Sequence, residues 1–132
     1  MEASLQQDEQ FPNNNVKACI LPWIHLFGSL SGNFYICCHA EYTPKPKIMG
    51  TYKQSLGDIW NSPDYKQARL ALLNNKIPTE CIDACYRKET QGSNSNRLTV
   101  NRRFNHYAYL QDETNSDGSL DTTPQYLDIR FG

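Results

Sequence analysis

Five cysteines are the residues of this 132-residue chain with the clearest capacity for chemistry. Cys19, Cys37 and Cys38 lie in an early block, and Cys81 and Cys85 follow later as a C-x3-C pair. Thiolates bind zinc and iron–sulfur clusters, and in an oxidising compartment they form disulfides instead. Two blocks of clustered cysteines therefore indicate either a metal site or a disulfide framework.

The surrounding sequence favours the metal site. Residues 1–10 include Glu2, Asp8 and Glu9 and lack the apolar stretch of a secretory signal. No segment approaches the roughly 20 apolar residues of a membrane span. We therefore expect a cytoplasmic protein, whose thiols stay reduced. The adjacent Cys37 and Cys38 also have poor geometry for a mutual disulfide. Incidental or redox-active thiols are the alternative.

Composition limits the size of the core and the range of partners. The net charge of −1 gives no overall field that would attract nucleic acid or a membrane surface. Residues 1–15 are polar and are expected to form a disordered tail. The ordered body is then short, and small bodies usually need a staple such as a bound metal. Metal binding can supply that folding energy.

A hairpin is expected to bring the early cysteines together. Residues 20–27 are apolar and aromatic, and a strand-like run resumes at 34–37 after turn residues that include Gly32 and Asn33. Cys19 would lie at the entrance of this hairpin and the Cys37–Cys38 pair at its exit. The first block of thiols would then meet in space.

Helices are expected in the second half of the body. Ser55 and Ser62 each have the features of an N-cap, and Pro63 favours a helix that runs to about Leu73. A further helix after Pro78 would place Cys81 and Cys85 one turn apart on one face, with Gly92 as its end.

The last third of the chain is expected to contribute less to this site. Residues 97–110 predict a helix, 115–119 predict a flexible connection, and 125–132 alternate like a strand. That strand has no partner nearby in the sequence, so we expect an orphan strand. The predicted fold class is α+β: a small β-hairpin and two or three helices around one four-cysteine site, with a C-terminal orphan strand.

Several motifs together resemble a known family. Cys19, a twelve-residue gap and Gly32-x4-Cys37 are similar to the opening of the SPASM and twitch domains, the auxiliary iron–sulfur domains of radical SAM enzymes. The similarity extends over residues 19–97 through these further matches: Leu21-Pro-Trp-Ile-His25, Cys37-Cys38, Gly50, Leu56-Gly-Asp-Ile-Trp-Asn-Ser62, Arg69, Pro78, Cys81-x3-Cys85-Tyr86 and Glu89. Residues 126–132 look like the first strand of the radical SAM barrel.

The resemblance implies a specific cofactor and ligand set. Cys19, Cys37, Cys81 and Cys85 would be the four thiolates of one [4Fe–4S] cluster, with Cys38 as the alternative to Cys37. The chain has too few cysteines for the two clusters of a full SPASM domain, which favours the smaller twitch type. Its C-x3-C pair departs from the two-residue spacing that is common in the family. Four aromatic residues would exclude water from the cluster: Trp23, Phe34, Trp60 and Tyr86.

The resemblance also implies a division of the chain and a missing partner. Residues 16–97 would be the cluster-binding domain, 98–124 a helix and linker, and 125–132 the first strand of a barrel. The C-x3-C-x2-C loop that binds the S-adenosylmethionine-cleaving cluster is not in this sequence. We therefore expect a truncated or split N-terminal portion, with the barrel lost in cis or supplied in trans. The sequence does not decide whether the chain is an enzyme. S-adenosylmethionine would bind only if that barrel is present. The expected substrate is a peptide or a protein.

Other interpretations remain open at this stage. The same four cysteines could hold a structural zinc ion in a small interaction module. His25 or His39 could replace a thiolate, although a hydrogen-bonded histidine is the simpler interpretation. Basic and aromatic residues in 97–109 could track nucleic acid, but a solvated helix face explains them more simply: Arg97, Arg102, Arg103, His106, Tyr107 and Tyr109. A thiol oxidoreductase is excluded, because the chain has no C-x-x-C motif.

Overall fold

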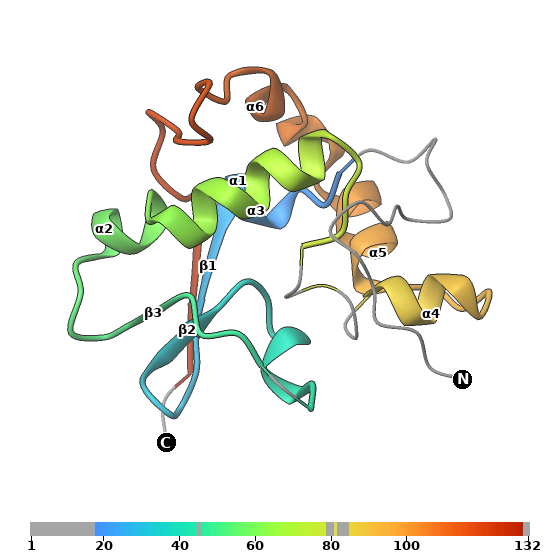
Figure 1. The fold of residues 1–132 in the computed structure, drawn as a ribbon, viewed down its shortest axis with the longest axis horizontal. Helices are drawn as coiled ribbons and strands as arrows, with labels where there is room; N and C mark the ends of the chain where they lie inside the picture. The colour runs from blue at the N-terminus through green and yellow to red at the C-terminus, as the bar shows by residue number, and fades with distance from the viewer. Residues whose placement is uncertain (1–17, 45, 79–80, 82–84, 131–132) are drawn as a thin grey trace.

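The computed structural model describes residues 18–44, 46–78, 81 and 85–130, and these form an α+β fold. A four-stranded sheet has the order β3-β2-β1-β4 and lies beneath α1 and α3 (Figure 1). The predicted fold class is confirmed. The helices and strands have these bounds: α1 Leu21–Ile24, β1 His25–Gly28, β2 Asn33–Tyr35, β3 Gly50–Thr51, α2 Leu56–Trp60, α3 Pro63–Leu73, α4 Arg87–Thr90, α5 Asn96–Arg103, α6 Tyr109–Asp112 and β4 Tyr126–Ile129, with 3₁₀ turns at Ala40–Tyr42 and Asn105–Tyr107.

The predicted hairpin is present but shorter than expected. Strands β1 and β2 pair antiparallel, with Phe27 opposite Tyr35, and Gly32 turns the chain with a φ of 87°. Residues 21–24 form the helical turn α1 instead of extending β1, so this part of the prediction is wrong. Pro22 suits the first turn of a helix, and every α1 residue is buried. Alternating hydrophobicity could not reveal this, because a segment buried on all sides fits either conformation.

The two predicted N-caps are confirmed. The Ser55 hydroxyl accepts a hydrogen bond from the Asp58 backbone N–H at 3.1 Å, and α2 follows. The Ser62 hydroxyl accepts one from the Tyr65 N–H at 3.3 Å, and α3 begins at Pro63. Helix α3 then packs its buried face against α1. Local capping chemistry therefore determines where both helices begin.

The last third of the chain differs most from expectation. The single helix predicted over 97–110 is divided into α5, a 3₁₀ turn and α6, because the backbone leaves helical geometry at Phe104, whose ring packs 5.3 Å from that of Tyr126. Strand β4 forms as predicted but is no orphan. It pairs parallel with β1, so that His25 lies opposite Tyr126 and Gly28 opposite Ile129. A pairing between segments so distant in sequence leaves no local signal.

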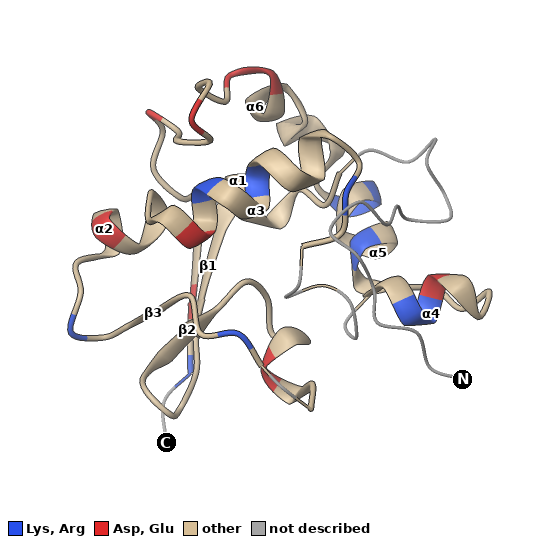
Figure 2. Cartoon of the chain, viewed as in Figure 1, with Lys and Arg blue, Asp and Glu red and all other residues tan. Residues whose placement is uncertain are grey.

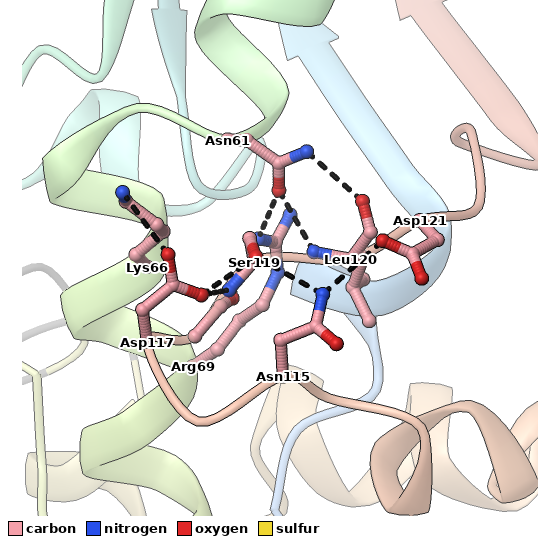
Figure 3. Close-up of polar contacts among 9 residues, drawn as sticks. Asn61, Lys66, Arg69, Asn115, Asp117, Ser119, Leu120 and Asp121 are labelled. Atoms are coloured by element: carbon pink, nitrogen blue, oxygen red, sulfur yellow. Dashed lines mark hydrogen bonds and ion pairs between the residues drawn. The ribbon is translucent and has the colours of Figure 1, made fainter.

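The connection at 115–119, predicted to be flexible, is held by hydrogen bonds to α3 (Figure 3). Arg69 is fully buried and donates to the Gly118 carbonyl at 3.0 Å, while Asn61 bonds to the backbone of Leu120 through both its oxygen and its nitrogen. Arg69 also donates to the carbonyls of Pro22 and Trp60 at 2.8 and 2.6 Å. One guanidinium therefore joins α1, α2 and the segment before β4.

Candidate metal centre

Four of the five cysteines line one small cavity. Cys19 lies just before α1, Cys37 lies just after β2, and Cys81 and Cys85 lie just before α4. The last three residues are buried and Cys19 is half-buried. The cavity has a volume of about 10 Å³, and these other residues complete its wall: Leu21, Pro22, Ile36, Leu72, Asn96 and Arg97. Residues 82–84 lie outside the described residues, so the predicted helical turn between Cys81 and Cys85 stays a prediction.

The thiols surround the cavity without meeting at one point. Within the described ranges, no three Cys, His, Asp or Glu side chains form a group that could hold a single metal ion. A tetrahedral zinc ion needs each of its four sulfurs at about 2.3 Å. A [4Fe–4S] cluster instead distributes four thiolates over four iron atoms.

Burial keeps Cys19, Cys37 and Cys85 protonated when no metal is bound, because it raises the pKa of each thiol. Desolvation, followed by repulsion from the Cys85 sulfur, raises the pKa of Cys37 to about 12. The same two causes raise the pKa of Cys19 still further, and desolvation raises that of Cys85. Metal ligation requires thiolates, so binding must release protons from this cavity.

A buried ion pair stands beside the thiols. Arg97 at the start of α5 lines the cavity, and two of its nitrogens contact the Glu89 carboxylate of α4 at 2.9 and 2.5 Å. Both side chains are at most 1% exposed. The Ser95 hydroxyl donates to the same carboxylate at 2.6 Å. The expectation of a solvated helix face is therefore wrong for Arg97.

Comparison with protein families identifies this arrangement. The model of SPASM, an iron–sulfur cluster-binding domain, matches residues 19–86, just over half of the chain. The chain belongs to the SPASM family. The SPASM domain accordingly binds an iron–sulfur cluster, and the matched segment includes Cys19, Cys37, Cys81 and Cys85. The resemblance seen in the sequence is confirmed at this level. No curated protein and no solved structure matches the chain closely.

Residues beyond the SPASM match fix the position of Cys19. The Asn101 side chain of α5 accepts a hydrogen bond from the Ile20 N–H at 2.9 Å and donates one to the Ala18 carbonyl at 3.1 Å. Gln111 of α6 donates to the same carbonyl at 3.0 Å. Three hydrogen bonds thus hold the backbone on both sides of Cys19. The sequence alone does not reveal the role of these two residues, because single amides in a polar helix give no signal of distant partners.

The alternative ligands lie elsewhere in the SPASM domain. Cys38 and His39 line a separate pocket of about 380 Å³, whose other residues are Tyr42, Thr43, Pro44, Lys88 and Arg130. His25 lies on β1, and its ring is stacked with that of Phe27, with 6.5 Å between the ring centroids. Neither histidine is among the residues that line the four-cysteine cavity.

The aromatic shell expected around the cluster is not what surrounds the cavity. The described lining is largely aliphatic and includes none of Trp23, Phe34, Trp60 and Tyr86. Trp23 instead donates to the Thr114 hydroxyl at 2.8 Å, and Trp60 donates to the Thr122 carbonyl at 2.8 Å. The two tryptophans anchor the C-terminal segment, while Leu21, Ile36 and Leu72 surround the thiols.

The chain carries both acidic and basic residues in similar numbers. Acidic and basic residues are scattered over the elements, and the charged residues of α5 are basic (Figure 2). Of these, Arg102 and Arg103 are exposed, whereas Arg97 is buried in its ion pair with Glu89. Among the described residues, no helix has the length and apolar character needed to span a membrane.

Proposed function

We propose that this SPASM domain holds one auxiliary [4Fe–4S] cluster through Cys19, Cys37, Cys81 and Cys85. The observation that supports this most strongly is that these four thiols, from three separate segments, line the same enclosed cavity. Four cysteines are the usual complement of such a cluster. Cys37 is preferred to Cys38, because Cys38 lines a different pocket. The five free thiols suit the reducing cytoplasm, where we propose that the protein works.

The donor set fits a cluster, but the cavity must widen to receive it. A volume of about 10 Å³ admits roughly one water molecule. Loading would therefore move the thiols outward as they lose their protons. The bound cluster would supply one-electron transfer, and the aliphatic wall of Leu21, Ile36 and Leu72 would keep water from it. Asn101 and Gln111 would hold the backbone of Cys19 during this change.

We further propose that the domain works with a radical SAM barrel. Residues 126–132 resemble the first strand of such a barrel, and the barrel would come from further sequence of this chain or from a separate chain. S-adenosylmethionine would bind to that barrel. The auxiliary cluster would position a peptide or protein substrate or relay an electron. A C-x3-C-x2-C motif encoded directly downstream of Gly132 would support the arrangement in cis.

Anaerobic reconstitution tests the cluster assignment. The purified chain would be incubated with iron, sulfide and a reductant, and then desalted for metal analysis, absorption and EPR spectroscopy. We expect about four iron atoms per chain, a broad visible absorption that bleaches on reduction, and an EPR signal from the reduced cluster. A colourless protein with one tightly bound zinc ion would show instead that the zinc alternative is correct.

A further inference from the structure

In the described part of the chain, Glu89 and Arg97 form an ion pair whose two side chains are both buried, and this pair adjoins the thiol cavity. Removing two charges from water is costly, and a buried pair is often no more stable than apolar residues of the same size. The fold itself therefore gives little reason to place this pair here. Its position beside four potential thiolates suggests an electrostatic role.

The two charges stand in different relations to the cavity. Arg97 is part of the wall, and its charge acts on both Cys19 and Cys85, whereas Glu89 is not among the lining residues and acts on Cys85. The Arg97 backbone N–H also donates a hydrogen bond to the Cys85 sulfur. Arg97 thus presents a cation and a donor to the cavity, with the Glu89 carboxylate behind it.

We propose that the Glu89–Arg97 pair sets the reduction potential of the cluster, an inference that depends on the proposed function. Reduction adds one electron to the cluster, and charges interact strongly where water is excluded. The Arg97 cation and its N–H stabilise the reduced state and raise the potential, while the Glu89 carboxylate lowers it. The pair acts as an oriented dipole whose positive end faces the thiols.

Two charge-removing variants should shift the potential in opposite directions. The wild type, Glu89→Gln and Arg97→Gln would be reconstituted, reduced stepwise with dithionite and followed by EPR. We expect Glu89→Gln to raise the potential and Arg97→Gln to lower it. Each shift should reach at least about tenfold in the one-electron equilibrium, which corresponds to about 59 mV. A purely structural pair would lose cluster in both variants or shift both potentials in the same direction.

Two further variants keep the inference testable if a single change prevents folding. Glu89→Gln/Arg97→Gln keeps hydrogen-bonding groups without a buried unpaired charge, and we expect a lower potential than in the wild type because the nearer charge is lost. Arg102→Gln removes an exposed charge from the same helix and should leave the potential unchanged.

The outcomes separate this inference from the proposed function. Variants that load iron with unshifted potentials, or with shifts of the same sign, would overturn the role of the pair while leaving the cluster assignment intact. A wild type that loads no iron would overturn both.

Discussion

Replacing Arg69 by methionine should expose how the C-terminal segment is attached to the core. The guanidinium donates to three backbone carbonyls, those of Pro22, Trp60 and Gly118, at 2.6–3.0 Å. Methionine fills similar space but leaves these oxygens without their donor. An unsatisfied buried acceptor costs about 1–3 kcal/mol.

For the three carbonyls that Arg69 contacts, the lower end of this 1–3 kcal/mol range, about 1 kcal/mol each, applies. Burial lowers the pKa of Arg69 to about 10, which reflects the cost of placing a cation here, and methionine removes that cost. At about 1 kcal/mol for each carbonyl, Arg69→Met should lower the free energy of unfolding by about 3 kcal/mol. For a domain of this size the melting temperature would fall by very roughly 15 °C.

Urea denaturation followed by circular dichroism measures this loss. Lys66→Met is a matched control on the same helix, because its contact with Asp117 at 3.5 Å is partly exposed and should contribute less than about 1 kcal/mol. A loss below about 1 kcal/mol in Arg69→Met would contradict this role of the guanidinium, since it would mean that water or another donor satisfies the three carbonyls.

Three further predictions address other parts of the structure. Asn101→Ala removes two hydrogen bonds beside Cys19, so it should lower the free energy of unfolding by about 2 kcal/mol and reduce iron loading. An iron content equal to that of the wild type would contradict this role of Asn101. Gly118→Ala should lower the melting temperature, because the added Cβ would clash with the Lys66 carbonyl oxygen and the backbone φ there is +93°. An unchanged melting temperature would show that the turn can shift. The metal-free protein should lose stability as the pH rises from about 8.5 towards 12, because folding raises the pKa of Cys37 to about 12. The free energy of unfolding should fall by about 1.4 kcal/mol per pH unit for each such thiol, and Cys37→Ala should reduce this pH dependence. A free energy of unfolding that stays constant between about pH 7.5 and 10 would count against thiol burial.

Features specified by neighbouring residues could be predicted from the sequence. The N-caps at Ser55 and Ser62 depend on atoms within one helical turn, and both helices begin where the sequence indicates. The hairpin turn at Gly32 depends on a local backbone requirement. The family could be predicted for a different reason, since cysteine and glycine spacing is a direct property of the sequence.

Features that depend on distant partners could not be predicted. The β4 strand pattern was visible, but its pairing with β1 joins segments at opposite ends of the chain. Arg97 looked like part of a solvated basic face, because its burial requires Glu89 to be brought against it by the turn around Gly92. The residues 115–119 looked flexible, because their order comes from Arg69 and Asn61. In each case the deciding atom lies in another element.

The proposed ligand set can be tested by the iron content of five single cysteine-to-serine variants after reconstitution. We expect large losses of iron and of the cluster spectrum in the variants of the cavity-lining thiols: Cys19, Cys37, Cys81 and Cys85. Cys38→Ser is the matched control, since Cys38 neighbours Cys37 but lines a different pocket, and it should load iron like the wild type. Full loading in Cys37→Ser together with loss in Cys38→Ser would contradict the ligand set proposed for this domain.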